Sequence, residues 1–104
     1  MIKHGKTWLD SKAFIQALTH TSSNVRETAA TALGKIKDPR AVTPLTKVLL
    51  RDRNPAVRLA AVKALGEIGD IRAVLPLTEA LDDSVDDVRD EAKNALKRIN
   101  DFRP

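Results

Sequence analysis

Apolar residues recur along this chain at helical spacing, and the same spacing returns three times. In the middle of the chain they are Val57, Ala61, Leu65 and Ile68, separated by three or four positions. This spacing places all four side chains on one side of an α-helix. The same pattern occurs over residues 25–36 and 88–99. Because no segment shows the alternation of a half-buried strand, the pattern predicts an all-α protein.

A second helix-forming segment precedes each of these three helices. Thr7, Asp38 and Asp70 hold equivalent positions at the start of these first helices. Their side chains can accept a hydrogen bond from the free backbone N–H groups of a first turn, so we expect them to be N-caps. Thr7 also begins a Thr-x-x-Asp sequence of the capping-box form. Pro44 and Pro76 fall inside two of the first helices, where each should remove a donor and bend the helix.

The helix pairs repeat with a period of 31 to 32 residues. Arg26, Arg58 and Arg89, for example, hold the same position in successive pairs. A period of this length is typical of stacked repeats, in which each pair buries its apolar side against its neighbours. The sequence therefore predicts one domain over residues 1–104, an α-solenoid of six helices with repeats at about residues 7–36, 38–68 and 70–100.

Two of the repeats share a detailed motif, V-R-x-x-A-A/V-x-A-L-G-x-I-x-D-x-R-A-V-x-P-L-x-x-x-L. It covers residues 25–49 and again residues 57–81 in register. The motif resembles HEAT repeats, in particular the short variety named after the phycobilisome lyase proteins. The resemblance implies a right-handed α-solenoid with the second helices lining a concave face. It also implies protein binding, which in some members means service as a subunit of a bilin lyase.

The resemblance further implies a ladder of ion pairs. In the family, the arginine that follows the first valine of the second helix reaches an aspartate in a neighbouring turn. Carried over residue by residue, this predicts contacts of Arg26, Arg58 and Arg89 with Asp38 and Asp70.

The end repeats differ from the middle repeat at positions that would face a further neighbour. Lys93 and Lys97 of the third repeat replace a valine and a glycine of the second. Asp10 and Ser11 of the first repeat replace an alanine and a valine. Burying two lysines against apolar neighbours would carry a large desolvation cost. We therefore expect both outer faces to be polar and exposed, as in the terminal repeats of a complete three-repeat protein.

The second helices also carry positions that are offset from the apolar stripe, two, six and ten residues after the first valine. Leu59 is expected to be an exposed apolar centre among residues of mixed charge, which suits a protein partner better than a polyanion. An ordinary solvated surface is the alternative. The predicted partner-binding residues on the concave face are Glu27, Thr31, Lys35, Leu59, Lys63, Glu67, Asp90, Asn94 and Arg98.

Charge is unevenly distributed along the chain. The formal net charge is +4, the sum of +6 over residues 1–53 and −2 over residues 54–104. Such asymmetry can orient a partner or favour head-to-tail contacts between copies, although many soluble surfaces show it without such a role. Nucleic-acid binding is a weaker alternative, because aromatic residues make up only 3% of the chain and few side chains could stack on bases. A basic end for that function would comprise Lys3, Lys6, Lys12, Arg51 and Arg53.

Residues that could perform catalysis are scarce. The chain has no cysteine, and its two histidines, His4 and His20, are not spaced with a nucleophile or carboxylate. The acidic run at residues 82–87 lacks the spacing of a calcium-binding loop and precedes a helix whose N-terminus favours acids. Trp8 is either a binding anchor or a cover over the first repeat.

We therefore expect a non-catalytic interaction or scaffold module without cofactor or metal. Accessory service to an enzyme such as a chromophore lyase is the alternative. No segment is apolar enough to span a membrane, and the N-terminus lacks the apolar region of a secretion signal. The sequence thus favours a cytoplasmic protein that is monomeric or weakly self-associating.

Overall fold

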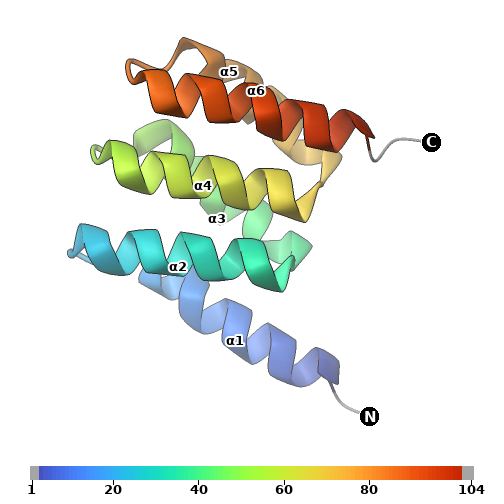
Figure 1. The fold of residues 1–104 in the computed structure, drawn as a ribbon. Coiled ribbons are helices and arrows are strands. Elements are labelled where there is room, and N and C mark those ends of the chain that lie inside the picture. The colour runs from blue at the N-terminus through green and yellow to red at the C-terminus, as the bar shows by residue number, and fades with distance from the viewer. Residues whose placement is uncertain (1–2, 102–104) are drawn as a thin grey trace.

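The computed structural model describes the backbone of residues 3–101 and the side chains from Thr7 onward, and this part of the chain contains no strand. Its chain order alternates a first and a second helix in each of three pairs (Figure 1). The α-helices are α1 Lys3–Ala17, α2 Ser23–Ile36, α3 Val42–Arg51, α4 Pro55–Ile68, α5 Val74–Glu79 and α6 Asp86–Asp101. The 3-10 turns are η1 Pro39–Ala41, η2 Ile71–Ala73 and η3 Ala80–Asp82.

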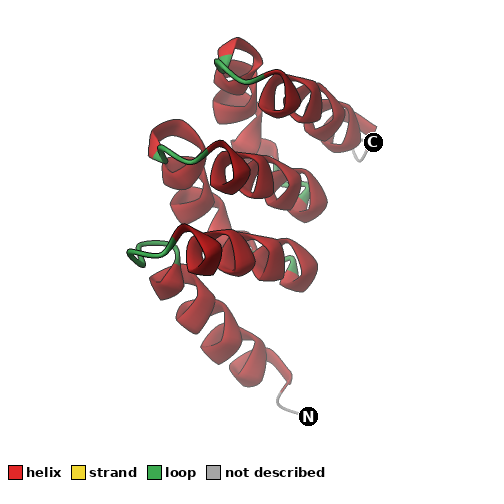
Figure 2. Cartoon of the chain, turned by 60° about the vertical axis from the view of Figure 1, so that its left-hand side comes forward, coloured by secondary structure: helices red, strands yellow, loops and turns green. Residues whose placement is uncertain are grey.

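The helices form two layers. The second helices α2, α4 and α6 lie side by side, while α3 and α5 lie behind them (Figures 1 and 2). Helix α1 runs obliquely to α2 at the N-terminal end of the stack (Figure 1). Principal extents of 42 × 40 × 15 Å describe a thin slab. The prediction of an α-solenoid of helix pairs is confirmed.

The core consists of small and medium-sized aliphatic side chains. Helix α4 is flanked by α2 and α6 and also packs on α3, so it buries residues on several sides. Aromatic residues contribute little, since Phe14 only packs partly buried against the core. The largest fully buried apolar side chains are Leu33, Leu45, Leu49, Leu65, Leu77, Ile99, Val57, Val62 and Val88.

Two glycines allow the second helices to approach closely. A Cβ atom at Gly34 would lie 2.9 Å from the Ala64 Cα atom of α4. A Cβ atom at Gly66 would lie 2.9 Å from the Ala95 Cβ atom of α6. Both glycines are buried within helices, so their role is to permit close packing of neighbouring second helices. The third repeat has Lys97 at this position, and its side chain is exposed, as predicted.

Two of the three predicted N-caps of the first helices are confirmed. The Asp38 carboxylate accepts a hydrogen bond from the Arg40 backbone N–H at 3.0 Å, and Asp70 accepts one from Arg72 at 2.8 Å. These residues cap the 3-10 turns that lead into α3 and α5. Thr7 is not a cap and begins no capping box, because α1 starts upstream at Lys3 and includes it.

The prolines lie closer to the helix starts than the sequence predicts. Pro44 and Pro76 are the third residues of α3 and α5. Backbone N–H groups in the first turn have no acceptor within their own α-helix. The prolines therefore remove no hydrogen bond from either α-helix, contrary to expectation, and they mark the change from 3-10 turn to α-helix.

Asp38 is a buried carboxylate at the junction of the first and second repeats. Its side chain is 3% exposed and pairs with the half-exposed Arg40 guanidinium at 2.8 Å. The Arg40 hydrogen bonds lower the pKa of Asp38 to about 2. The buried Ser11 hydroxyl forms no well-aligned hydrogen bond, but it lies near the Asp38 carboxylate and helps to lower the pKa of Asp38. Because Ser11 is buried here, the prediction that it faces solvent is wrong, whereas Asp10 is exposed as predicted.

Replacing Gly34 by alanine should lower the free energy of unfolding by about 1 kcal/mol. Overpacking against α4 costs roughly 1–3 kcal/mol, which the better helix propensity of alanine offsets only in part. Urea denaturation would measure the change. Lys97→Ala is the matched control, because no helix of the described chain packs on that position, and it should change stability little. A Gly34→Ala variant as stable as the native protein would contradict the close-approach argument.

The Asp38–Arg40 pair should contribute to acid sensitivity. The pKa of Asp38 is depressed in the folded state, so its contribution is present above the unfolded pKa of about 3.9 and is lost as pH falls toward 2. Solvent around Arg40 screens the pair, so we expect about 1–2 kcal/mol. Asp38→Asn, which can still cap η1, should lose less stability than the native protein between pH 5 and pH 2 in urea denaturation. Equal losses in both proteins would refute this role, and Asp10→Asn is the control.

Candidate functional site

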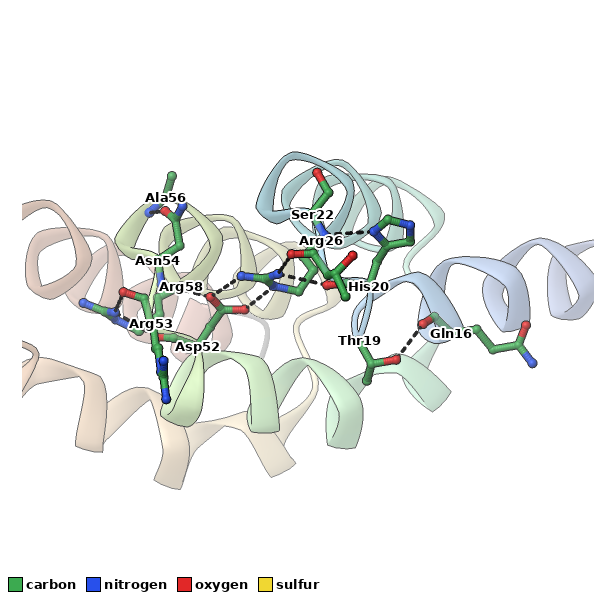
Figure 3. A network of polar contacts seen from close by, with 11 residues as sticks. Gln16, Thr19, His20, Ser22, Arg26, Asp52, Arg53, Asn54, Ala56 and Arg58 are labelled. Atoms are coloured by element: carbon green, nitrogen blue, oxygen red, sulfur yellow. Dashed lines mark hydrogen bonds and ion pairs between the residues drawn. The ribbon is translucent and has the colours of Figure 1, made fainter.

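Arginines at the start of the second helices connect neighbouring repeats (Figure 3). Arg26 of α2 donates from Nε and Nη2 to the Asp52 carboxylate at 2.8 and 3.1 Å. Its Nη1 donates to the carbonyl oxygens of His20 and Thr21 at 2.9 and 3.0 Å. One guanidinium thus ties the loop before α2 to the loop that follows α3.

The next arginine repeats this arrangement. Arg58 of α4 donates to the Asp83 carboxylate at 2.9 and 3.1 Å and to the Asp52 carbonyl oxygen at 2.9 Å. Arg89 of α6 binds the Asp83 carbonyl oxygen at 2.7 Å but pairs with Asp86 of its own helix. Arg26 and Arg58 each bind an aspartate of the repeat that follows. Within residues 3–101 no further repeat follows α6, so Arg89 has no aspartate of this kind to bind.

The predicted partners of this ladder are therefore wrong. Asp38 and Asp70 follow the C-terminal ends of α2 and α4, whereas the ladder arginines lie near the N-terminal ends. A helix of 14 residues is about 21 Å long, beyond the reach of an arginine side chain. Asp38 and Asp70 instead pair with the adjacent Arg40 and Arg72. The repeated aspartates of the loops inside pairs, Asp52 and Asp83, were the signal that could have found the true partners.

Burial and ion pairing have opposite effects on the pKa values of the two ladder carboxylates, Asp52 and Asp83. Burial by itself raises the pKa of Asp52, but the Arg26 guanidinium and the Asn54 backbone N–H outweigh it, and the pKa is lowered. Burial likewise raises the pKa of Asp83, but the Arg58 guanidinium and the Val85 backbone N–H outweigh it, and the pKa is lowered. Both carboxylates thus remain charged near neutral pH, and the ladder is a structural network rather than a source of acid–base chemistry.

The nine predicted partner-binding residues lie on α2, α4 and α6, and we call this set the second-helix face. Seven of the nine are exposed, while Leu59 and Glu67 are half-buried. Leu59 packs against the hydrophobic core, so the prediction that it forms a fully exposed apolar centre is wrong. The exposed members are Glu27, Thr31, Lys35, Lys63, Asp90, Asn94 and Arg98.

The first-helix layer carries exposed apolar residues that the sequence reasoning missed. Leu50 is 44% exposed, and Leu75 is 77% exposed. Sequence reasoning missed them because it placed the binding surface on the second helices. Trp8 is 36% exposed, and its ring lies over the Arg40 guanidinium at 4.2 Å, so this side chain packs on the start of the second repeat.

Residues for cofactor or metal chemistry do not come together. Among the described residues, no three histidine, cysteine or acidic side chains could hold a metal ion. In the acidic run, Asp83 pairs with Arg58, and Asp86 and Asp87 occupy the first turn of α6, which agrees with the capping interpretation. His4 lies where side chains are not described. No described helix is long and apolar enough to cross a membrane.

Comparison with known proteins agrees with the fold. The family model for HEAT repeats matches residues 11–97. Among solved structures, the chain is similar to human deoxyhypusine hydroxylase in complex with glycerol, with a TM-score of 0.80 and 32% sequence identity. The similarity covers 86% of this chain but only 32% of that enzyme, so this chain spans about a third of its length. A search of curated proteins finds no match. Because the family match extends over most of the sequence, this chain belongs to the HEAT repeat family.

Proposed function

We propose that this chain is a protein-binding module that docks a segment of another protein on its second-helix face and has no catalytic activity of its own. The observation that carries this proposal is the charge pattern of that face. It holds three acidic and three basic side chains, and among the described residues none of the six forms an ion pair. They are Glu27, Glu67, Asp90, Lys35, Lys63 and Arg98.

A surface of this kind suits a folded or extended protein segment. Unpaired charges of both signs can be matched by a complementary polypeptide, which gives specificity and orientation. The resemblance to HEAT repeats points the same way, because such repeats are mostly used for protein binding. The ladder fixes the spacing of the second helices, so the partner would meet a preformed surface and binding would require little ordering of this chain.

Other functions have less support. A polyanion such as nucleic acid gains nothing from a face whose charges cancel, and the exposed basic residues Lys12, Arg51 and Arg53 lie elsewhere. The similar solved structure is an enzyme, but this chain spans only a third of it. Service as an accessory subunit, for example of a chromophore lyase of the phycobilisome type, is compatible with the same docking surface. Co-purification with an enzyme would identify that case.

Acidic substitutions across the middle of the second-helix face should strongly weaken partner binding. Thr31, Lys63 and Asn94 form a row across α2, α4 and α6 and are all exposed, so Thr31→Glu, Lys63→Glu and Asn94→Glu should leave the fold intact. In a pull-down from lysate of the source cells, the triple variant should retain at least about tenfold less of the partner than the native protein.

The matched control is the Lys93→Glu, Lys97→Glu variant, which alters exposed residues of α6 outside this face. It should retain the partner, and thermal melting should show that both variants are folded. Equal retention of the same protein by all three forms would contradict the proposed site.

A further inference from the structure

Three hollows border α3. One is mostly polar, has a volume of 320 Å³ and includes Arg51, Glu79 and Asp82. The other two lie on opposite sides of α3, one toward α1 and one toward α5.

The hollow between α1 and α3 has a volume of 530 Å³, and its apolar floor includes Ile15, Leu18 and Val48. The hollow between α3 and α5 has a volume of 360 Å³ and includes Leu50 and Pro76. Both are open grooves lined mostly by apolar atoms. They lie on α1, α3 and α5, away from the second-helix face.

A polar row on α3 separates the two apolar hollows. Thr43, Lys47 and Arg51 border both of them and lie four residues apart on one side of the helix. We call these three residues the α3 ridge. Lys47 and Arg51 are exposed, and among the described residues neither forms an ion pair.

The other charged residues that border the two apolar hollows are already paired. Asp52, in the first hollow, accepts two hydrogen bonds from Arg26 at 2.8 and 3.1 Å. Arg72, in the second hollow, is bound to Asp70 at 2.8 Å and to the Pro39 carbonyl oxygen at 3.2 Å. Within the two apolar hollows the unpaired charge is therefore positive and is concentrated on the α3 ridge. The exposed acids Glu79 and Asp82 lie beside Arg51 in the polar hollow.

We propose that the α3 ridge and the two apolar hollows form a second docking surface, which binds an acidic amphipathic helix of a partner protein. Packed helices lie roughly 8–10 Å apart, so hollows on opposite sides of one helix are separated by a similar distance. Residues seven apart on a bound helix are about 10.5 Å apart along its axis. Apolar side chains at positions 1 and 8 of the partner helix enter the two hollows, and acids at positions 4 and 5 lie over the ridge.

Other occupants fit these observations less well. Nucleic acid would need more cations and aromatic side chains to stack on bases, and neither hollow is lined by an aromatic residue. A second copy of this chain lacks a suitable helix in its described part. Its most acidic helix, α6, buries its apolar residues in the core.

Titration with synthetic peptides tests the proposal directly. The probe is a labelled 18-residue helical peptide with leucine at positions 1 and 8 of the motif and glutamate at positions 4 and 5. A second peptide has lysine in place of each glutamate. Fluorescence anisotropy should show that the native protein prefers the glutamate peptide by about tenfold or more, a preference weakened by salt. Lys47→Glu with Arg51→Glu should reverse this preference.

Two controls separate the ridge from general charge effects. Lys93→Glu with Lys97→Glu changes the net charge by the same amount at the same spacing on α6, and it should keep the native preference. Lys63→Glu on the second-helix face should also keep the native peptide preference. The test of the α3 ridge is therefore independent of the test of the proposed function. Circular dichroism would verify the fold of each variant.

Several results would overturn the proposal. They are no preference between the peptides, loss of preference in the α6 control, or amide chemical-shift changes on the second-helix face instead of at Ile15, Val48 and Leu50. Displacement of the glutamate peptide by a single-stranded oligonucleotide or by phosphatidylserine vesicles at equal charge would overturn it as well, because either would indicate a surface selective only for negative charge.

Discussion

The close approach of neighbouring second helices is the constraint on which the rest of this structure depends. Gly34 meets Ala64, and Gly66 meets Ala95, at distances that leave no room for a further carbon atom. Interfaces built from such small residues bury little area per side chain, so they need many contacts in register to be stable. The alanine-rich sequence of α4, the only helix in the described chain with a second helix on each side, follows from this requirement.

The arginine ladder supplies the register that small side chains cannot. Flat alanine surfaces would tolerate sliding of one helix past another, since each contact is weak and non-directional. Arg26 and Arg58 each bind a carboxylate of the next repeat through two parallel hydrogen bonds, which fixes orientation as well as distance. Packing along the helices and bonding at their N-terminal ends thus hold neighbouring repeats at one spacing.

The sequence predicts the fold because the repeat period and the apolar stripe both report burial. Leu33, Val57, Leu65 and Val88 are buried for the reason that their spacing indicates, and their equivalents Val25 and Leu96 in the end repeats are half-buried. Contacts at the ends of the helices are harder to predict from the sequence. The motif gives the ladder arginines, but their partners depend on which loop lies beside the N-terminal end of each second helix. Thr7 failed as a cap because capping chemistry alone does not exclude a helix that begins one turn earlier.

The candidate sites were only partly predictable, because exposure on a stacked helix depends on its neighbours as well as on its own periodicity. Leu59 follows the positional rule for an outward residue, yet it is half-covered on the crowded middle helix. Leu50 and Leu75 are exposed because the first helices make fewer contacts with one another than the second helices do. The loosely packed layer is thus where apolar residues can remain outside the core and hollows can form.

This division of roles between the layers has a consequence for function. The second helices need alanine and glycine at their contacts, so only their outward positions can vary without disturbing the stack. The first helices lack that restriction along α3, where Thr43, Lys47 and Arg51 border open hollows instead of a neighbouring backbone. A solenoid built in this way can present two chemically different surfaces, one polar with charges of both signs and one apolar with cations. Because the core lies between them, substitutions at exposed positions of either surface leave the other in place.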